Sequence, residues 1–206
     1  FSLPLIEDAA GALGSTYKNQ HLGTIGDAGI VSFNGNKIIT TGGGGAIFFK
    51  EPKKAEIARH IATTAKKKHA WLFQHDMLGY NYRMPNINAS IGCAQILKLD
   101  KFIENKRRLY LTYYNSLKEF DFFEVHAEPE NSVSNYWLQA IVLDKPDRAL
   151  RDSILEITNN NQIMTRPIWD PLHTLEHLKH FQRSDLSVTD NISNRVINIP
   201  SSASIL

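Results

Sequence analysis

The sequence has little of what several classes of protein require. It contains one cysteine, Cys93, so no disulfide can form within the chain, and a reducing compartment fits this usage. No apolar stretch reaches the length of a bilayer-spanning helix, and we expect a cytoplasmic protein without a membrane partner. Excess charge is also absent: the formal net charge is +2, which gives no reason to expect a nucleic-acid partner.

The 206 residues are enough for one sizeable domain or one and a half small ones. The first part shows strand-like segments at 3–6, 29–33 and 46–49 and helical patterns at 52–68, 86–99 and 100–119. The second shows a strand at 137–143, a helix at 147–159 capped by Asp147, a strand at 163–169 and a short helix at 186–196. We predict two α/β parts, residues 1–119 and 120–206, with Cys93 buried in its helix.

Lys37 points most directly to chemistry. It follows Ser32 in the loop after a strand and precedes four glycines, residues 42–45. Asp8 closes an earlier apolar strand, and ligands in open α/β sheets bind outside the carboxyl ends of strands. A lysine amine forms a Schiff base with a carbonyl cofactor, and an aspartate keeps a pyridinium nitrogen protonated. These residues are the parts of a pyridoxal phosphate site.

Three segments, at residues 7–15, 32–45 and 78–84, resemble the DegT/DnrJ/EryC1/StrS family of nucleotide-sugar aminotransferases in order and spacing. Residues 166–173 and 198–202 resemble the family's C-terminal region, so the resemblance covers nearly the whole chain. The sequence around Lys37 is most similar to the branch that makes amino sugars of the legionaminic-acid type. The resemblance implies an incomplete fold-type I pyridoxal phosphate transferase of the α/β class, because family members are considerably longer at the N-terminus.

The resemblance also implies roles for individual residues. Lys37 would carry the cofactor and move the substrate proton, Asp8 would bind the pyridinium nitrogen, and Ser32 would donate to the cofactor phosphate. Asn81 matches the family asparagine that reaches the phosphate of a neighbouring subunit, which implies a homodimer with shared active sites. On the substrate side the resemblance indicates three further residues: Arg83, Arg166 and His173.

The implied reaction moves an amino group from glutamate to a nucleotide-linked keto-deoxysugar, for bacterial surface polysaccharide, lipopolysaccharide or sialic-acid-like sugars. Members of a sugar dehydratase branch have histidine in place of the lysine, so Lys37 argues against that activity. A non-catalytic scaffold or dimerisation module stays open as a second hypothesis. Gly11 keeps it open, because related sequences often carry a polar side chain there near the cofactor ring hydroxyl. The resemblance also implies that the family's N-terminal part, which grips the cofactor phosphate, lies outside this chain.

Two other patterns in the sequence could indicate different chemistry. His173, His177 and His180 have the spacing of one helical face, which is compatible with zinc, but no acid stands at the HExxH position. We expect exposed histidines on a helix and no metal. The glycine run follows Lys37 and lacks a Gly-Lys-Ser/Thr ending, so it is not a nucleotide-binding P-loop.

Overall fold

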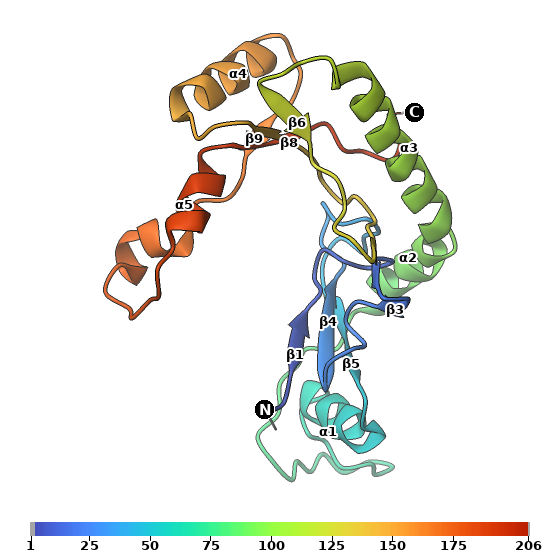
Figure 1. The fold of residues 1–206 in the computed structure, drawn as a ribbon. Coiled ribbons are helices and arrows are strands. Elements are labelled where there is room, and N and C mark those ends of the chain that lie inside the picture. Colours follow the sequence, from blue (N-terminus) through green and yellow to red (C-terminus); the bar gives the residue numbers. More distant parts are fainter. Residues whose placement is uncertain (1–2, 206) are drawn as a thin grey trace. The chain divides into compact units, whose positions relative to one another are not determined.

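The computed structural model describes residues 3–205, which form two compact units that share the helix α3 (Leu99–Leu117). Unit 1 contains the described residues up to Ile103 together with Pro129–Trp137, and unit 2 contains Glu104–Glu128 and the described residues from Leu138 onward. Figure 1 labels the main elements of both where there is room. A domain division between residues 119 and 120 stays a prediction.

Unit 1 is built on a three-stranded sheet in the order β1 (Ile6–Asp8), β4 (Ala28–Ser32) and β5 (Gly45–Phe49), seen in Figure 1. β1 runs parallel to β4 with Asp8 opposite Ile30, and β4 pairs with β5 in antiparallel fashion. Parallel pairing puts the carboxyl ends of β1 and β4 at one edge of the sheet. Asp8 and Ser32, the last residues of these two strands, therefore lie at the same edge of the sheet.

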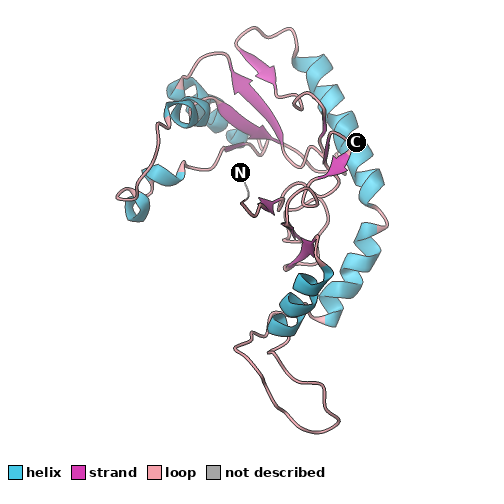
Figure 2. Cartoon of the chain, turned by 60° about the horizontal axis from the view of Figure 1, so that its bottom comes forward, coloured by secondary structure: helices cyan, strands magenta, loops and turns pink. Residues whose placement is uncertain are grey.

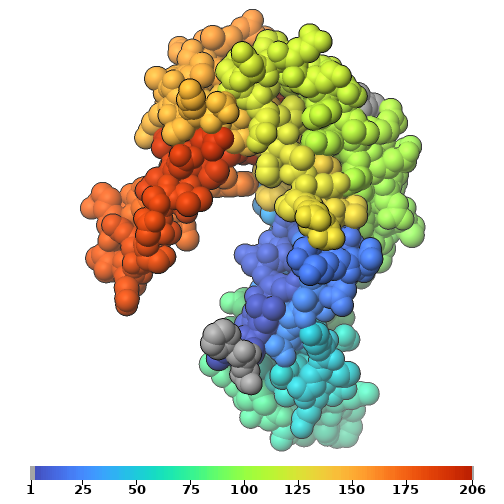
Figure 3. Space-filling model, viewed as in Figure 1, coloured from blue at the N-terminus to red at the C-terminus, as the bar shows by residue number. Residues whose placement is uncertain are grey.

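A second, smaller sheet joins a distant segment to unit 1. Its order is β3 (Gln20–His21), β2 (Thr16–Tyr17) and β7 (Ser132–Val133). Lys18 and Asn19 between β2 and β3 both have positive φ, as a tight two-residue hairpin requires. In Figure 3 the yellow residues near 130 lie against the blue residues of this hairpin. Pro129–Trp137 thus folds with unit 1, although it lies far from the hairpin in the sequence.

The helices of unit 1 are α1 (Pro52–Ala62) and α2 (Asn86–Ile96). α1 is shorter than the predicted helix at 52–68, because Thr64 and Ala65 adopt positive φ and end it. The long loop between α1 and α2, prominent in Figure 2, was predicted. The prediction of a buried Cys93 was wrong: this thiol is exposed, since no residue of α2 is buried in the described chain.

Unit 2 contains an antiparallel sheet in the order β6 (Phe123–Val125), β8 (Gln139–Leu143), β10 (Val196–Ile199) and β9 (Arg166–Pro167). Val125, Ile141 and Ile197 form its core, and side chains of α3 and α4 (Arg148–Asn160) pack against them. The carboxylate of Asp147 accepts a 2.9 Å hydrogen bond from the amide of Leu150, which confirms the predicted cap.

Two short 3₁₀ helices, η1 (Leu172–Thr174) and η2 (Glu176–Leu178), precede α5 (Ser187–Ser193). Leu175 is extended and separates η1 from η2, so the prediction of one helical face for the three histidines was wrong. Within residues 3–205 no group of three or more histidine, cysteine, aspartate or glutamate side chains could hold a metal ion. No described helix has both the length and the apolar character needed to cross a membrane.

Candidate functional site

Lys37 lies in a loop that is closed at its base and anchored in its interior. The amide of Phe33 donates to the carbonyl oxygen of Gly44 at 2.9 Å, which ties the start of the loop to its end. Ile38 and Ile39, which directly follow Lys37, are buried. The loop therefore cannot swing freely, and it holds the lysine beside the carboxyl end of β4.

The glycine turn that completes this loop needs glycine. Gly42 and Gly44 have φ of 80° and 90°, values that residues with a Cβ rarely adopt. The turn is fixed from α2, because the side-chain amide of Asn88 donates to the carbonyl oxygen of the buried Thr41 at 2.5 Å. The result is a rigid backbone turn without side chains, which a ligand can approach closely.

Two opposing effects act on the amine of Lys37. Partial burial lowers the pKa of Lys37, and the negative charge of Asp8 acts to raise it. Asp8 stands exposed at the end of β1, where its carboxylate accepts a 3.1 Å hydrogen bond from the amide of Ala10. A lysine with a lowered pKa is unprotonated more of the time, which nucleophilic attack and proton transfer both require.

Ser32 is the third predicted residue at this edge. It is the last residue of β4, and its hydroxyl oxygen accepts a 3.2 Å hydrogen bond from the amide of Asn34. A hydroxyl that accepts one hydrogen bond still has its proton to donate. Asp8, Ser32 and Lys37 thus converge on the edge formed by the carboxyl ends of two parallel strands.

Glu7 has a different role, although it neighbours Asp8. Its carboxylate accepts hydrogen bonds of 2.6 to 2.8 Å from three amides of the following loop: Gly23, Ile25 and Gly26. Desolvation acts to raise the pKa of Glu7, but these hydrogen bonds and the charge of Lys50 outweigh it and hold the pKa below its ordinary value. Glu7 fixes the loop beside β1, which leaves Asp8 as the acid at the strand end.

Trp137 is a member of this group that the sequence does not reveal, because the apolar run at 137–143 predicts a strand of the second part. The amine nitrogen of Lys37 lies 3.5 Å from the centroid of its ring. Its indole N–H donates to the carbonyl oxygen of Asn36 at 2.6 Å. The one available signal was Gly11: a Cβ built there would lie 2.6 Å from the indole, so the missing side chain leaves room for the tryptophan.

The other predicted site residues do not join this group through any contact found in residues 3–205. Asn81 and Arg83 are exposed on the loop between α1 and α2. Arg166 and His173 belong to unit 2. There Arg166 donates to the side-chain oxygen of Asn159 at 3.0 Å, and a ring nitrogen of His173 lies 2.8 Å from the carboxylate of Asp190.

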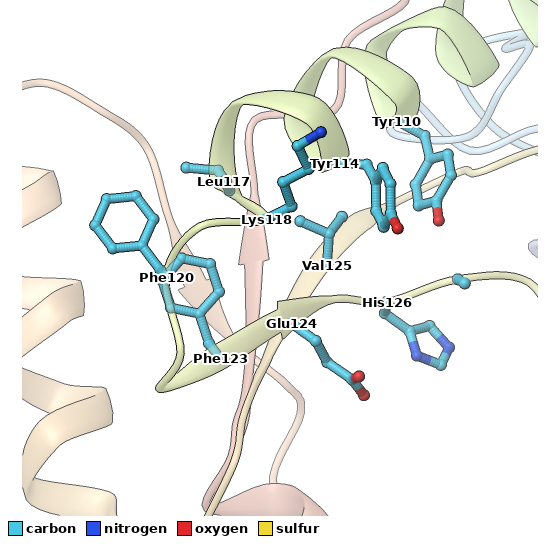
Figure 4. Close-up of a pocket in the computed structure, with 10 residues that line it drawn as sticks. Tyr110, Tyr114, Leu117, Lys118, Phe120, Phe123, Glu124, Val125 and His126 are labelled. Atoms are coloured by element: carbon cyan, nitrogen blue, oxygen red, sulfur yellow. The ribbon is translucent and has the colours of Figure 1, made fainter.

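Unit 2 also has a cavity of about 550 Å³, shown in Figure 4. Tyr110 and Tyr114 stack side by side in its wall, with ring centroids 6.2 Å apart, and Phe120 and Phe123 line the opposite end. None of the residues predicted for the site lines this cavity. The group around Lys37 is therefore the candidate site.

Comparison with known proteins agrees with the sequence resemblance. Residues 1–205 match the model of the DegT/DnrJ/EryC1/StrS aminotransferase family. EpsN of Bacillus subtilis, named as a candidate pyridoxal phosphate-dependent aminotransferase, is 38% identical over all of this chain and 53% of its own length. GDP-perosamine synthase of Vibrio cholerae is 36% identical over 97% of the chain and 54% of its own length.

The fold gives the same answer. The crystal structure of the aminotransferase TlmJ from Streptoalloteichus hindustanus superposes with a TM-score of 0.91 at 26% identity, over 99% of this chain and 55% of that one. The chain thus spans about half the length of the proteins it matches, in keeping with the expected incomplete fold-type I architecture. On these grounds the chain belongs to the DegT/DnrJ/EryC1/StrS aminotransferase family.

Proposed function

We propose that this chain carries the lysine-bearing part of the active site of a pyridoxal phosphate-dependent sugar aminotransferase. The observation that carries the proposal is the convergence of Lys37, with its lowered pKa, and Asp8 at the carboxyl edge of β1 and β4. Family membership and the name of EpsN support the cofactor. The name of GDP-perosamine synthase supports a nucleotide-linked sugar as the acceptor.

The residues present fit this cofactor. A partly buried amine, an acid at a strand end, and a strand-end hydroxyl beside a turn of glycines with positive φ suit its carbonyl, its ring nitrogen and its phosphate. When bound, pyridoxal phosphate supplies an electrophilic carbonyl and a ring that withdraws electrons. The chain needs to provide only binding, orientation and proton transfer.

The proposal gives Lys37 two tasks and Asp8 and Ser32 one task each. Lys37 provides the amine that binds the carbonyl and, once released by the amino donor, carries a proton to and from the substrate carbon. The lowered pKa of Lys37 serves both tasks, because only the neutral amine can accept the proton. Asp8 pairs with the ring nitrogen and keeps it protonated. Ser32 donates to the phosphate, beside the glycine turn.

The remaining assignments extend the proposal to the assembled protein. Glutamate is the amino donor, and a nucleotide-linked keto-deoxysugar is the acceptor. The amino sugar that results is used in a bacterial surface glycan. The enzyme is a homodimer in which Asn81 of each chain serves the phosphate of its neighbour. The exposed position of Asn81, outside the group around Lys37, supports this assignment to a second chain. Arg83, Arg166 and His173 contact the sugar nucleotide.

Trapping of the cofactor tests the proposal. The chain is mixed with pyridoxal phosphate, reduced with borohydride and digested, and the modified peptide is identified by mass spectrometry. We expect one dominant adduct at Lys37 and its loss in Lys37→Ala. The exposed lysines Lys53 and Lys98 give the background level in the same digest.

Two further variants separate site chemistry from nonspecific labelling. Asp8→Asn is expected to weaken retention of the cofactor at Lys37, whereas Glu56→Gln on α1 removes the same charge from an exposed position and changes nothing. Equal labelling of Lys37 and the exposed lysines would overturn the proposal for this chain. It would favour the scaffold hypothesis, in which the chain forms a dimer and binds no cofactor.

A further inference from the structure

The Trp137 indole contacts the candidate site through its ring face, its N–H and the edge of its six-membered ring. The ring face lies against the amine of Lys37, with 3.5 Å from the amine nitrogen to the ring centroid. The indole N–H donates to the carbonyl oxygen of Asn36, one residue before that lysine, at 2.6 Å. The six-membered ring covers Gly11, where a Cβ would lie 2.6 Å from Cε3 and 2.9 Å from Cζ3.

The backbone that carries the indole is fixed as firmly as the ring. The buried Asn135 accepts a 2.8 Å hydrogen bond from the amide of Trp137 with its side-chain oxygen. Its side-chain nitrogen donates to the carbonyl oxygens of Gly11 and Leu13, both at 2.9 Å. One side chain therefore ties the tryptophan to the loop that follows Asp8, and the indole N–H ties it to the loop of Lys37.

The ring exerts two effects on the amine that it touches. It removes water from one side, which favours the neutral amine, and its π-face attracts the ammonium, which favours the charged amine. Asp8 is the charged group that acts on Lys37, and it also favours the ammonium. An amine held by these opposing effects stays near the site in either protonation state.

We propose that Trp137 is a positioning residue for Lys37, whose indole face holds the amine at the strand edge while its N–H holds the loop. This inference rests on the proposed function, because it assigns a second residue to the lysine that carries the reaction. It also accounts for Gly11. The indole occupies the space of the side chain that the family resemblance leads one to expect there, so a glycine at 11 is the complement of the tryptophan and not a loss of function.

The first readout is the pH profile of acetylation at Lys37, measured by peptide mass spectrometry without pyridoxal phosphate. Trp137→Phe keeps a ring face, and Trp137→Leu keeps apolar bulk without one. We expect the midpoint for Trp137→Leu to lie about half a pH unit below that for Trp137→Phe, because only the phenyl face favours the ammonium. Trp71→Phe, at an exposed tryptophan of unit 1, is the matched control and should keep the native midpoint.

The second readout is hydrogen exchange in the peptide that contains residues 34–41. Trp137→Phe has no N–H for the carbonyl of Asn36, so we expect exchange there to quicken several-fold, with no change in Trp71→Phe. Trp137→Met replaces the leucine variant should that one fail to fold by circular dichroism. Equal midpoints in the phenylalanine and aliphatic variants, or native exchange in Trp137→Phe, would overturn the inference.

Both readouts are independent of the cofactor. A chain that shows the expected profiles but gives no borohydride-trapped adduct at Lys37 would overturn the proposed function and leave the positioning contact established. A chain that traps the cofactor at Lys37 but shows neither effect of the Trp137 substitutions would support the proposed function and overturn the positioning role of Trp137.

Discussion

The side-chain amide of Asn135 donates a 2.9 Å hydrogen bond to the carbonyl oxygen of Gly11, across 124 positions of the sequence. This bond joins Pro129–Trp137 to the loop that follows Asp8, and Asn135 is 3% exposed. A buried polar side chain that makes several hydrogen bonds to backbone groups specifies one packing of two loops. The candidate site thus depends on a segment that the chain supplies long after Lys37.

Replacement of Asn135 should therefore be costly. Asn135→Leu leaves the carbonyl oxygens of Gly11 and Leu13 and the amide of Trp137 without their partner, and we expect the free energy of unfolding to fall by about 2–4 kcal/mol. Urea unfolding followed by circular dichroism measures the change. Asn86→Ala, at an exposed asparagine of α2, should stay within about 0.5 kcal/mol of the native chain. A small change in Asn135→Leu would mean that the two loops are held by other contacts.

The local elements around the site could be predicted from the sequence. The strand that ends at Ser32, the loop that carries Lys37 and the cap at Asp147 follow from short-range patterns. The prediction of the first strand at 3–6 was too early, because β1 is Ile6–Asp8. The end of α1 could not be predicted, because it depends on positive φ at Thr64 and Ala65. Neither residue is a glycine or an asparagine, the residue types that usually indicate such a conformation. The exposed Cys93 could not either, because apolar residues on a helix predict a buried face whether or not the described chain covers it.

Trp137 shows why the rest of the site escaped prediction. It lies in the last residues of Pro129–Trp137, and β7 in that segment has two residues, too few for any period. Its place beside Lys37 depends on the pairing of β7 with β2 and on the hydrogen bonds of Asn135, both of which are long-range. The only signal in the sequence is Gly11, which stands where related sequences often carry a polar side chain. The glycine indicates a free space there but not which side chain fills it.

That space gives a prediction for the pair Gly11 and Trp137. Gly11→Ala puts a methyl group 2.6 Å from Cε3 of the indole, and we expect a loss of about 1–3 kcal/mol in the free energy of unfolding. In a Trp137→Leu background the same substitution should cost clearly less, because the clash is relieved. A double-mutant cycle measures the coupling between the two positions.

Gly35→Ala is the matched control for this cycle, because no atom lies within 4 Å of a Cβ at Gly35. It should cost little in either background. Additive effects of Gly11→Ala and Trp137→Leu would show that the indole moves aside freely and is not fixed over Gly11.

Glu7 should make the stability of unit 1 depend on acidic pH. Its pKa in the folded chain is held below the ordinary 4.5, so the unfolded chain binds the proton more readily. The stabilising contribution of Glu7 is therefore full above about pH 4.5 and is lost as the pH falls through the lower pKa of the folded state. Glu7→Gln should lower the free energy of unfolding at pH 7 and flatten its decline between pH 6 and 3, measured with urea at a series of pH values. Glu56→Gln should leave the native decline intact.

Lys106 should make the stability of unit 2 depend on alkaline pH. Burial lowers the pKa of Lys106 to about 8 from 10.5, and its amine donates a hydrogen bond to the carbonyl oxygen of Ser201. Above pH 8 the unfolded chain binds more protons at this position than the folded chain, so the free energy of unfolding should rise with pH. The rise should amount to roughly 1–2 kcal/mol once solvent screening is allowed for.

Lys106→Met removes this titration and should abolish the rise, whereas Lys118→Met, at an exposed lysine of the same unit, should keep it. The measurement runs from pH 7.5 to 9.5. It stops there because burial raises the pKa of Tyr113, which donates to the carbonyl oxygen of Pro200, and a phenol with a raised pKa makes stability fall at higher pH. An unchanged rise of the free energy of unfolding in Lys106→Met would assign the rise to another group. The amine of Lys106 would then be charged in both the folded and the unfolded chain below pH 9.5.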